Sequence, residues 1–197
     1  MKLSAKLRTL LFTLPLTLAM GATGCATEAA DEGDEAGDEP ISSVSDALST
    51  TSCKLSRSQI LSSVSGSRRT AIERGFRWFD RDVSYSQSRY YEGYRTDCSG
   101  FISMCWQLGT SYTTASFMNE GSTWDKLSSY SQLKPGDALV RRSNGAGHIV
   151  LFLGWNPGGN SACVLEQAST ASDMEFRART RSSLTGSGYR PITASKF

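Results

Sequence analysis

Five short segments that read as strands follow one another in the second half of the chain, and they constrain the fold more than any other feature. They read DALV (137–140), HIVLFLGW (148–155), ACVLEQA (162–168), MEFRART (174–180) and GYRPITA (188–194). Between them lie connectors rich in glycine, asparagine and serine, several of them of hairpin length. Segments of this length and pattern, with such connectors, predict the strands of an antiparallel sheet.

Helical patterns precede these strands. Ser56 is followed three residues later by Gln59, which is a capping box and predicts a helix that begins there. Ile72, Phe76 and Phe79 then recur at the spacing of one helix face. Two helical segments are therefore expected before residue 81.

A third helix is expected after Asp97, a natural N-cap that places Cys98 in the first turn. Gly109 is expected to end this helix. Helices followed by strands predict an α+β fold, with N-terminal helices packed on an antiparallel sheet of about five to six strands.

Residues 1–25 have the pattern of an export signal. Three basic residues precede an apolar run, Leu10–Met20, that is short for a membrane span. The run ends in GATGC, which resembles the lipidation site of bacterial lipoproteins and would make Cys25 a lipid anchor. Ordinary cleavage after a small residue is the alternative. We therefore expect an exported protein, either membrane-anchored, with the outer membrane favoured, or secreted.

The rest of the chain divides by charge. Residues 26–50 hold eight acids, no Lys or Arg and no aromatic residue, which predicts a disordered tether or, alternatively, an acidic propeptide. Residues 51–197 have the length of one domain and carry 18 basic and 11 acidic residues, a net charge of +7. Such a domain would be attracted to an anionic polymer such as a bacterial cell wall. No motif indicates a nucleic-acid partner, and we expect a monomer.

The residues of a nucleophile and a base are both present. A cysteine at the start of a helix favours the reactive thiolate, which suits Cys98. The one histidine of the chain, His148, opens an apolar strand beside glycines. A third group must orient the imidazole, and the next strand offers Glu166 and Gln167. Because neighbours in a strand face opposite ways, only one of them can face the site.

These motifs together resemble the NlpC/P60 family of papain-like cysteine peptidases. The matching segments are DCSGF, LKPGDALV, GHIVLFLGW and LEQAS, in that order, and the likeness covers roughly residues 57–194. The resemblance implies that Cys98 is the nucleophile, His148 the base and Gln167 the orienting residue, with Glu166 as the competing candidate. It also implies substrate or oxyanion contacts by Tyr85, Asp97 and Ser99.

The resemblance further implies hydrolysis of peptidoglycan stem peptides, with cleavage between D-glutamate and the diamino acid. The alternatives are an N-acetylmuramoyl-L-alanine amidase or an acyltransferase on the same scaffold, and a non-catalytic lipoprotein that binds the cell wall. No cofactor is expected. Tyr85 is matched to a family Pro-Tyr element although Ser84 replaces the proline.

The remaining cysteines allow one disulfide. With Cys25 and Cys98 assigned, Cys105 lies on the face of Cys98 one heptad later and is expected in the core. Cys53 and Cys163 are then the expected pair, which would tie the start of the domain to the sheet. The scattered cysteines and single histidine lack the spacing of metal ligands, so no metal site is expected.

Overall fold

A computed structural model describes residues 52–119 and 121–197. The predictions for residues 1–25, including lipidation of Cys25, and for residues 26–50 lie outside the described residues. Within the described part of the chain, no helix has both the length and the apolar character needed to cross a membrane.

Three helices, at residues 57–62, 66–80 and 98–105, begin where the sequence patterns place them, whereas those at residues 114–118 and 181–186 were not predicted. Their bounds are α1 (Arg57–Ser62), α2 (Gly66–Asp80), α3 (Cys98–Cys105), α4 (Thr114–Met118) and α5 (Arg181–Gly186), with a short 3-10 helix η2 (Tyr130–Gln132). The capping box at Ser56 and Gln59 is formed, which confirms the predicted start of α1. The predicted end of α3 near Gly109 is wrong. The helix ends at Cys105, and Gln107 takes the left-handed conformation that was expected of a glycine.

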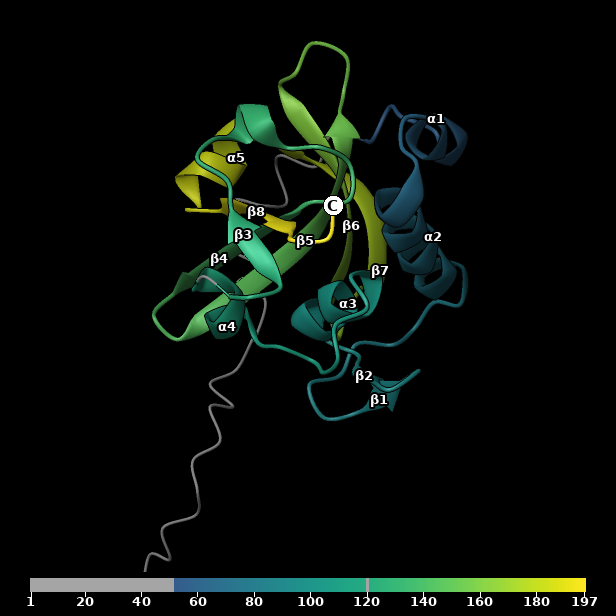
Figure 1. The fold of residues 1–197 in the computed structure, drawn as a ribbon, viewed down its shortest axis with the longest axis vertical. Helices are drawn as coiled ribbons and strands as arrows, with labels where there is room; N and C mark the ends of the chain where they lie inside the picture. Colours follow the sequence, from purple (N-terminus) through teal and green to yellow (C-terminus); the bar gives the residue numbers. More distant parts are fainter. Residues whose placement is uncertain (1–51, 120) are drawn as a thin grey trace, which may run out of the picture. The chain divides into compact units, whose positions relative to one another are not determined.

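Six of the strands form one antiparallel sheet (Figure 1). Their bounds are β3 (Trp124–Lys126), β4 (Ala138–Ser143), β5 (Ala146–Trp155), β6 (Ser161–Ser169), β7 (Asp173–Thr180) and β8 (Arg190–Ala194). The order across the sheet is β3-β8-β4-β5-β6-β7, with every neighbouring pair antiparallel. The predicted mixed fold with an antiparallel sheet is confirmed, and all five predicted strands are present.

A second, two-stranded ladder was missed. It pairs β1 (Tyr90–Tyr91) with β2 (Tyr94–Arg95). The two residues between them, Glu92 and Gly93, both have positive φ, as a tight two-residue hairpin requires. The hairpin lies in the segment between α2 and α3, which the sequence marked only as irregular.

The sheet separates two hydrophobic clusters, which are named here for the elements that cover them. The helix-side cluster joins α2 and α3 to alternate strand residues such as Ile149, Leu151 and Leu165. The far-side cluster joins α5 to the intervening residues, such as Val150 and Phe152. In Figure 1, α2 and α5 lie on opposite sides of the sheet. The pairing of β4 with β5 runs without a bulge through residue 151, so the facing of each side chain in this stretch is fixed by its position.

Candidate functional site

The start of α3 is built by the DCSG sequence itself. Asp97 caps the helix by accepting a hydrogen bond from the Gly100 amide at 2.6 Å. The Ser99 hydroxyl lies 3.2 Å from the same carboxylate oxygen. A Cβ on Gly100 would lie 1.9 Å from the carbonyl oxygen of Arg95, so only glycine fits there. Asp97, Ser99 and Gly100 therefore have structural roles at this helix start that do not depend on a catalytic role for Cys98.

Arg95 fixes this helix start from one side. Its Nε donates to Asp97, and its Nη2 donates to the Ser99 hydroxyl at 3.0 Å and to the Tyr112 carbonyl at 3.1 Å. Asp97 and Ser99 were predicted as substrate or oxyanion contacts. In the structure both side chains are buried and bond within the protein.

Cys98 is the first residue of α3, is fully buried and is in no disulfide. It packs in the helix-side cluster. Tyr85 is also buried, and its backbone amide donates to Asp173 Oδ1 at 2.7 Å. Cys105, on the same helix, is fully buried, which confirms that it belongs to the core, and burial raises the pKa of its thiol.

His148 lies on the far side of the sheet. Its strand neighbour Ile149 faces the helices, so His148 shares the opposite face with Val150. Its Nε2 lies 2.6 Å from Glu166 Oε2. Nδ1 is buried and makes no hydrogen bond among the described residues.

The prediction that Gln167 orients His148 is wrong. Glu166 makes the contact with the imidazole, and Gln167 Nε2 instead donates to the Val83 carbonyl at 2.5 Å. The physical reason is strand alternation. Leu165 faces the helices, so Glu166 faces away from them and Gln167 faces back toward them.

Glu166 is the centre of a buried ionic cluster. It is fully buried and accepts from Arg177 Nε at 2.7 Å and from Arg179 Nη2 at 2.9 Å, in addition to its contact with His148. Burial alone would raise the pKa of Glu166, but Arg179, His148 and Arg177 outweigh it and hold the pKa well below its usual range. Burial lowers the pKa of His148, and Glu166 offsets part of that effect.

The proposed catalytic residues therefore do not meet in this structure. Cys98 and Gln167 lie on the helix side of the sheet, whereas His148 and Glu166 lie on the far side. The sequence did carry a sign of the ionic cluster around Glu166. Glu175, Arg177 and Arg179 alternate along β7, which places all three charges on the far face.

A cavity of about 380 Å³ opens near the start of α3. Its walls are Arg81, Val83 and Ser84 after α2, Arg89, Tyr90 and Tyr91 at the β1–β2 hairpin, and Thr96 before α3. We call it the arginine–tyrosine pocket. Most of this lining was missed, because the hairpin was not predicted and nothing in the sequence marks Arg81 or Arg89 among the 15 arginines of the chain.

No protein-family model matches this chain, and none of the curated proteins searched matches it either. The likeness to the NlpC/P60 family therefore remains a prediction from the four motifs.

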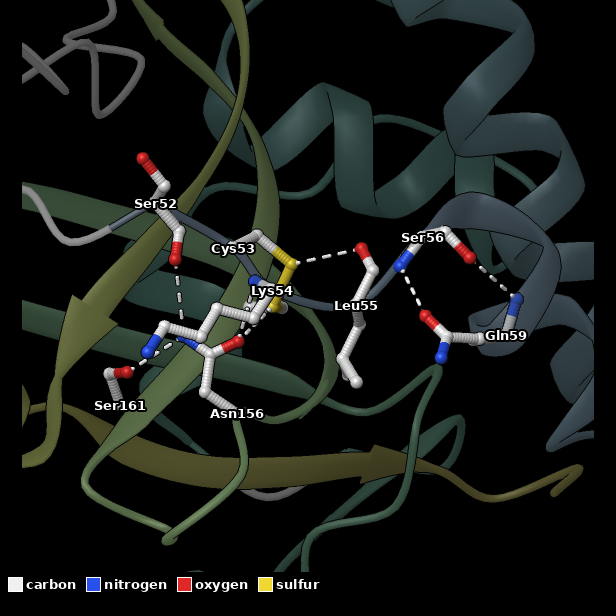
Figure 2. Close-up of a disulfide and its surroundings, with 9 residues drawn as sticks. Ser52, Cys53, Lys54, Leu55, Ser56, Gln59, Asn156 and Ser161 are labelled. Carbon is white, nitrogen blue, oxygen red and sulfur yellow. Dashed lines mark hydrogen bonds between the residues drawn. A yellow bond between two sulfur atoms is a disulfide. The ribbon is translucent and has the colours of Figure 1, made fainter.

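The disulfide between Cys53 and Cys163 is formed, as predicted (Figure 2). It joins the first described residues to β6 across 110 positions of sequence. Asn156 reinforces the attachment, since its Oδ1 accepts from the Lys54 amide at 2.8 Å and its Nδ2 donates to the Ser52 carbonyl at 3.3 Å. The beginning of the domain is thus held against the β5–β6 hairpin.

Residues 52–119 and 121–197 contain no cluster of three or more His, Cys, Asp or Glu side chains that could hold a metal ion.

Proposed function

We propose that this domain binds the peptide portion of peptidoglycan through the arginine–tyrosine pocket. The observation that carries the proposal is the pairing of two arginines with two tyrosines around one cavity of about 380 Å³. Cavities that bind small ligands begin at about 300 Å³. A volume of this size suits a short peptide segment.

The arginines of the pocket favour a carboxylate ligand. Arg77 and Arg95, which lie close by in the sequence, are both occupied by ion pairs. Among the described residues, the guanidinium groups of Arg81 and Arg89 take part in none. A guanidinium binds a carboxylate through two parallel hydrogen bonds, which gives both affinity and orientation. Stem peptides of peptidoglycan carry such carboxylates.

The tyrosines supply apolar contact area. Tyr90 is 65% exposed, and it is the only large hydrophobic residue of the described chain that is strongly exposed. Tyr91 packs edge-on against Trp78 with ring centroids 5.6 Å apart, which fixes its orientation. Rigid aromatic side chains of this kind contribute contact area at low entropic cost. The net charge of +7 on residues 51–197 would add long-range attraction to an anionic wall.

Sedimentation with insoluble peptidoglycan tests this proposal. The double variant Arg81→Ala/Arg89→Ala should bind peptidoglycan at least tenfold more weakly, because each substitution removes a charged contact with the ligand. The control Lys126→Ala/Arg190→Ala removes the same charge from exposed positions of β3 and β8 outside the pocket, and it should bind like the wild type. Equal loss in both variants would indicate general charge attraction and contradict the pocket. Unchanged binding by the arginine variant would also contradict it.

Amide hydrolysis by Cys98 is the second candidate. It is favoured by the position of Cys98 in the first turn of α3, on the same side of the sheet as the pocket residue Val83 and two positions after the pocket residue Thr96. In this reading, the pocket would hold the peptide whose amide the thiolate attacks.

Digestion of purified peptidoglycan separates the two candidates. Stem-peptide fragments that mass spectrometry finds with the wild type and not with Cys98→Ala would establish the hydrolase. A His148→Asn variant tests the base. Loss of activity with intact folding would mean that the imidazole acts from a different arrangement of the sheet. Retained activity would show that His148 is not the catalytic base. Wall binding without any fragments would favour the binding protein.

A further inference from the structure

One wall of the arginine–tyrosine pocket is held by the hairpin that joins β6 to β7. The wall is the segment Val83–Tyr85, in which the Val83 and Tyr85 side chains are buried and the Ser84 side chain is exposed and lines the pocket. The segment belongs to no helix or strand. Its conformation therefore depends on contacts made from elsewhere in the chain.

Two side chains of the hairpin bond the backbone on either side of Ser84. Gln167 Nε2 donates to the Val83 carbonyl at 2.5 Å, and Asp173 Oδ1 accepts from the Tyr85 amide at 2.7 Å. Gln167 and Val83 are both buried. Without the Gln167 amide, the Val83 carbonyl would therefore need another hydrogen-bond partner. Together these bonds fix the peptide units before and after the residue that faces the pocket.

The hairpin is shaped to make both contacts. The register of β6 with β7 shifts between Gln167 and Ser169. Asp173, the first residue of β7, has φ of 47°, a left-handed conformation that is uncommon for residues other than glycine, asparagine and aspartate. A strained position of this kind that also makes a long-range hydrogen bond suggests a specific role.

We propose that Gln167 and Asp173 are positioning residues for the ligand of the arginine–tyrosine pocket. They hold Val83–Tyr85 in the binding conformation before the ligand arrives, so that binding does not have to order this segment. This inference rests on the proposed function, because it assigns a role toward the ligand of that pocket. Without the two bonds, ordering the segment would weaken binding by about 3- to 10-fold.

A matched pair of variants at Asp173 isolates the hydrogen bond. Asp173→Gly keeps the left-handed backbone unstrained but removes the acceptor, whereas Asp173→Asn keeps both an acceptor and a tolerance for this conformation. Soluble muropeptides, released from purified peptidoglycan by a muramidase, serve as the ligand in calorimetric titrations of the full chain. We expect Asp173→Gly to bind about 3- to 10-fold more weakly and Asp173→Asn to bind like the wild type.

Hydrogen exchange at the Tyr85 amide provides the readout that a general loss of stability would not reproduce. This amide should exchange faster in Asp173→Gly and at the wild-type rate in Asp173→Asn, while amides of β5 remain protected in both. Wild-type affinity in Asp173→Gly despite fast exchange at Tyr85 would overturn the inference. Unchanged exchange would overturn it as well, because the bond would then not hold the segment.

Failure of the proposed function can be distinguished from failure of the positioning role alone. If the wild type does not bind muropeptides, or if Arg81→Ala/Arg89→Ala binds equally well, the proposed function fails and the positioning role fails with it. If binding depends on these arginines but not on Asp173, only the positioning role fails. Gln167→Met, which keeps the side-chain length and removes the donor, repeats the test from the other contact should Asp173→Gly not fold.

Discussion

The substitution Glu166→Gln removes one negative charge from a fully buried position while nearly preserving the volume of the side chain. Glu166 now accepts hydrogen bonds from Arg177 and Arg179 and contacts the imidazole of His148. A glutamine keeps one acceptor oxygen, but its amide N–H groups would face guanidinium donors. The expected result is a large loss of stability, because two positive side chains lose their buried partner.

The size of the loss follows from burial. The side chains of Arg179 and Arg177 are 10% and 26% exposed, and that of Glu166 is not exposed at all. Breaking a buried ion pair from one side costs about 3 to 5 kcal/mol, since the other charge is left uncompensated. For a domain of this size, such a loss lowers the melting temperature by about 10 to 20 °C.

Glu175→Gln is the matched control. Glu175 contacts the same Arg177 at 2.8 Å, from the same strand, but its side chain is 28% exposed. An ion pair between partly exposed side chains contributes about 1 kcal/mol, less than a fully buried one. Urea unfolding followed by tryptophan fluorescence at pH 7 measures both variants. A loss in Glu166→Gln no larger than that in Glu175→Gln would refute the conclusion that the buried cluster stabilises this face of the sheet.

Three further predictions concern other parts of the fold. Because burial lowers the pKa of His148 in the folded state, only the unfolded chain gains this proton readily, so the free energy of unfolding should fall as the pH drops below about 6.5. It should fall further below about 4.5, where Glu166 takes up a proton in the unfolded chain but stays ionised in the folded protein. Urea titrations at pH 7.5 and 5.5 should show a smaller decrease in His148→Asn than in the wild type, and an equal decrease would contradict this. Gly100→Ala places a Cβ 1.9 Å from a backbone oxygen, and chemical unfolding should show that it lowers the free energy of unfolding by about 2 kcal/mol or more. The control Gly109→Ala, whose Cβ meets nothing within 4 Å, should change the free energy of unfolding by less than about 0.5 kcal/mol. Reducing the Cys53–Cys163 disulfide, which spans 110 positions, should lower the free energy of unfolding by about 2 to 5 kcal/mol. Chemical unfolding with and without reductant measures this loss, and an unchanged midpoint would show that the link does not constrain the unfolded chain.

The sequence by itself determined helices α1 to α3, strands β4 to β8 and the antiparallel character of the sheet. The capping box at Ser56, the N-cap at Asp97 and the five strand-like segments are local signals, and each produced the helix start or strand that was expected. The disulfide could also be predicted, because two of the five cysteines were left once the others had been given roles. The β1–β2 hairpin escaped, since strands of two residues are too short to show a period.

Only the tertiary structure decided which functional side chains meet. The sequence established that Glu166 and Gln167 face opposite ways, but the choice of face depends on the register of β5 and β6 and on which surface α3 covers. Packing placed Leu151 and Leu165 against the helices, and alternation then placed His148 and Glu166 on the far side from Cys98. A strand pattern that is apolar on both faces, as in HIVLFLGW, carries no information about this choice, because both faces are equally buried.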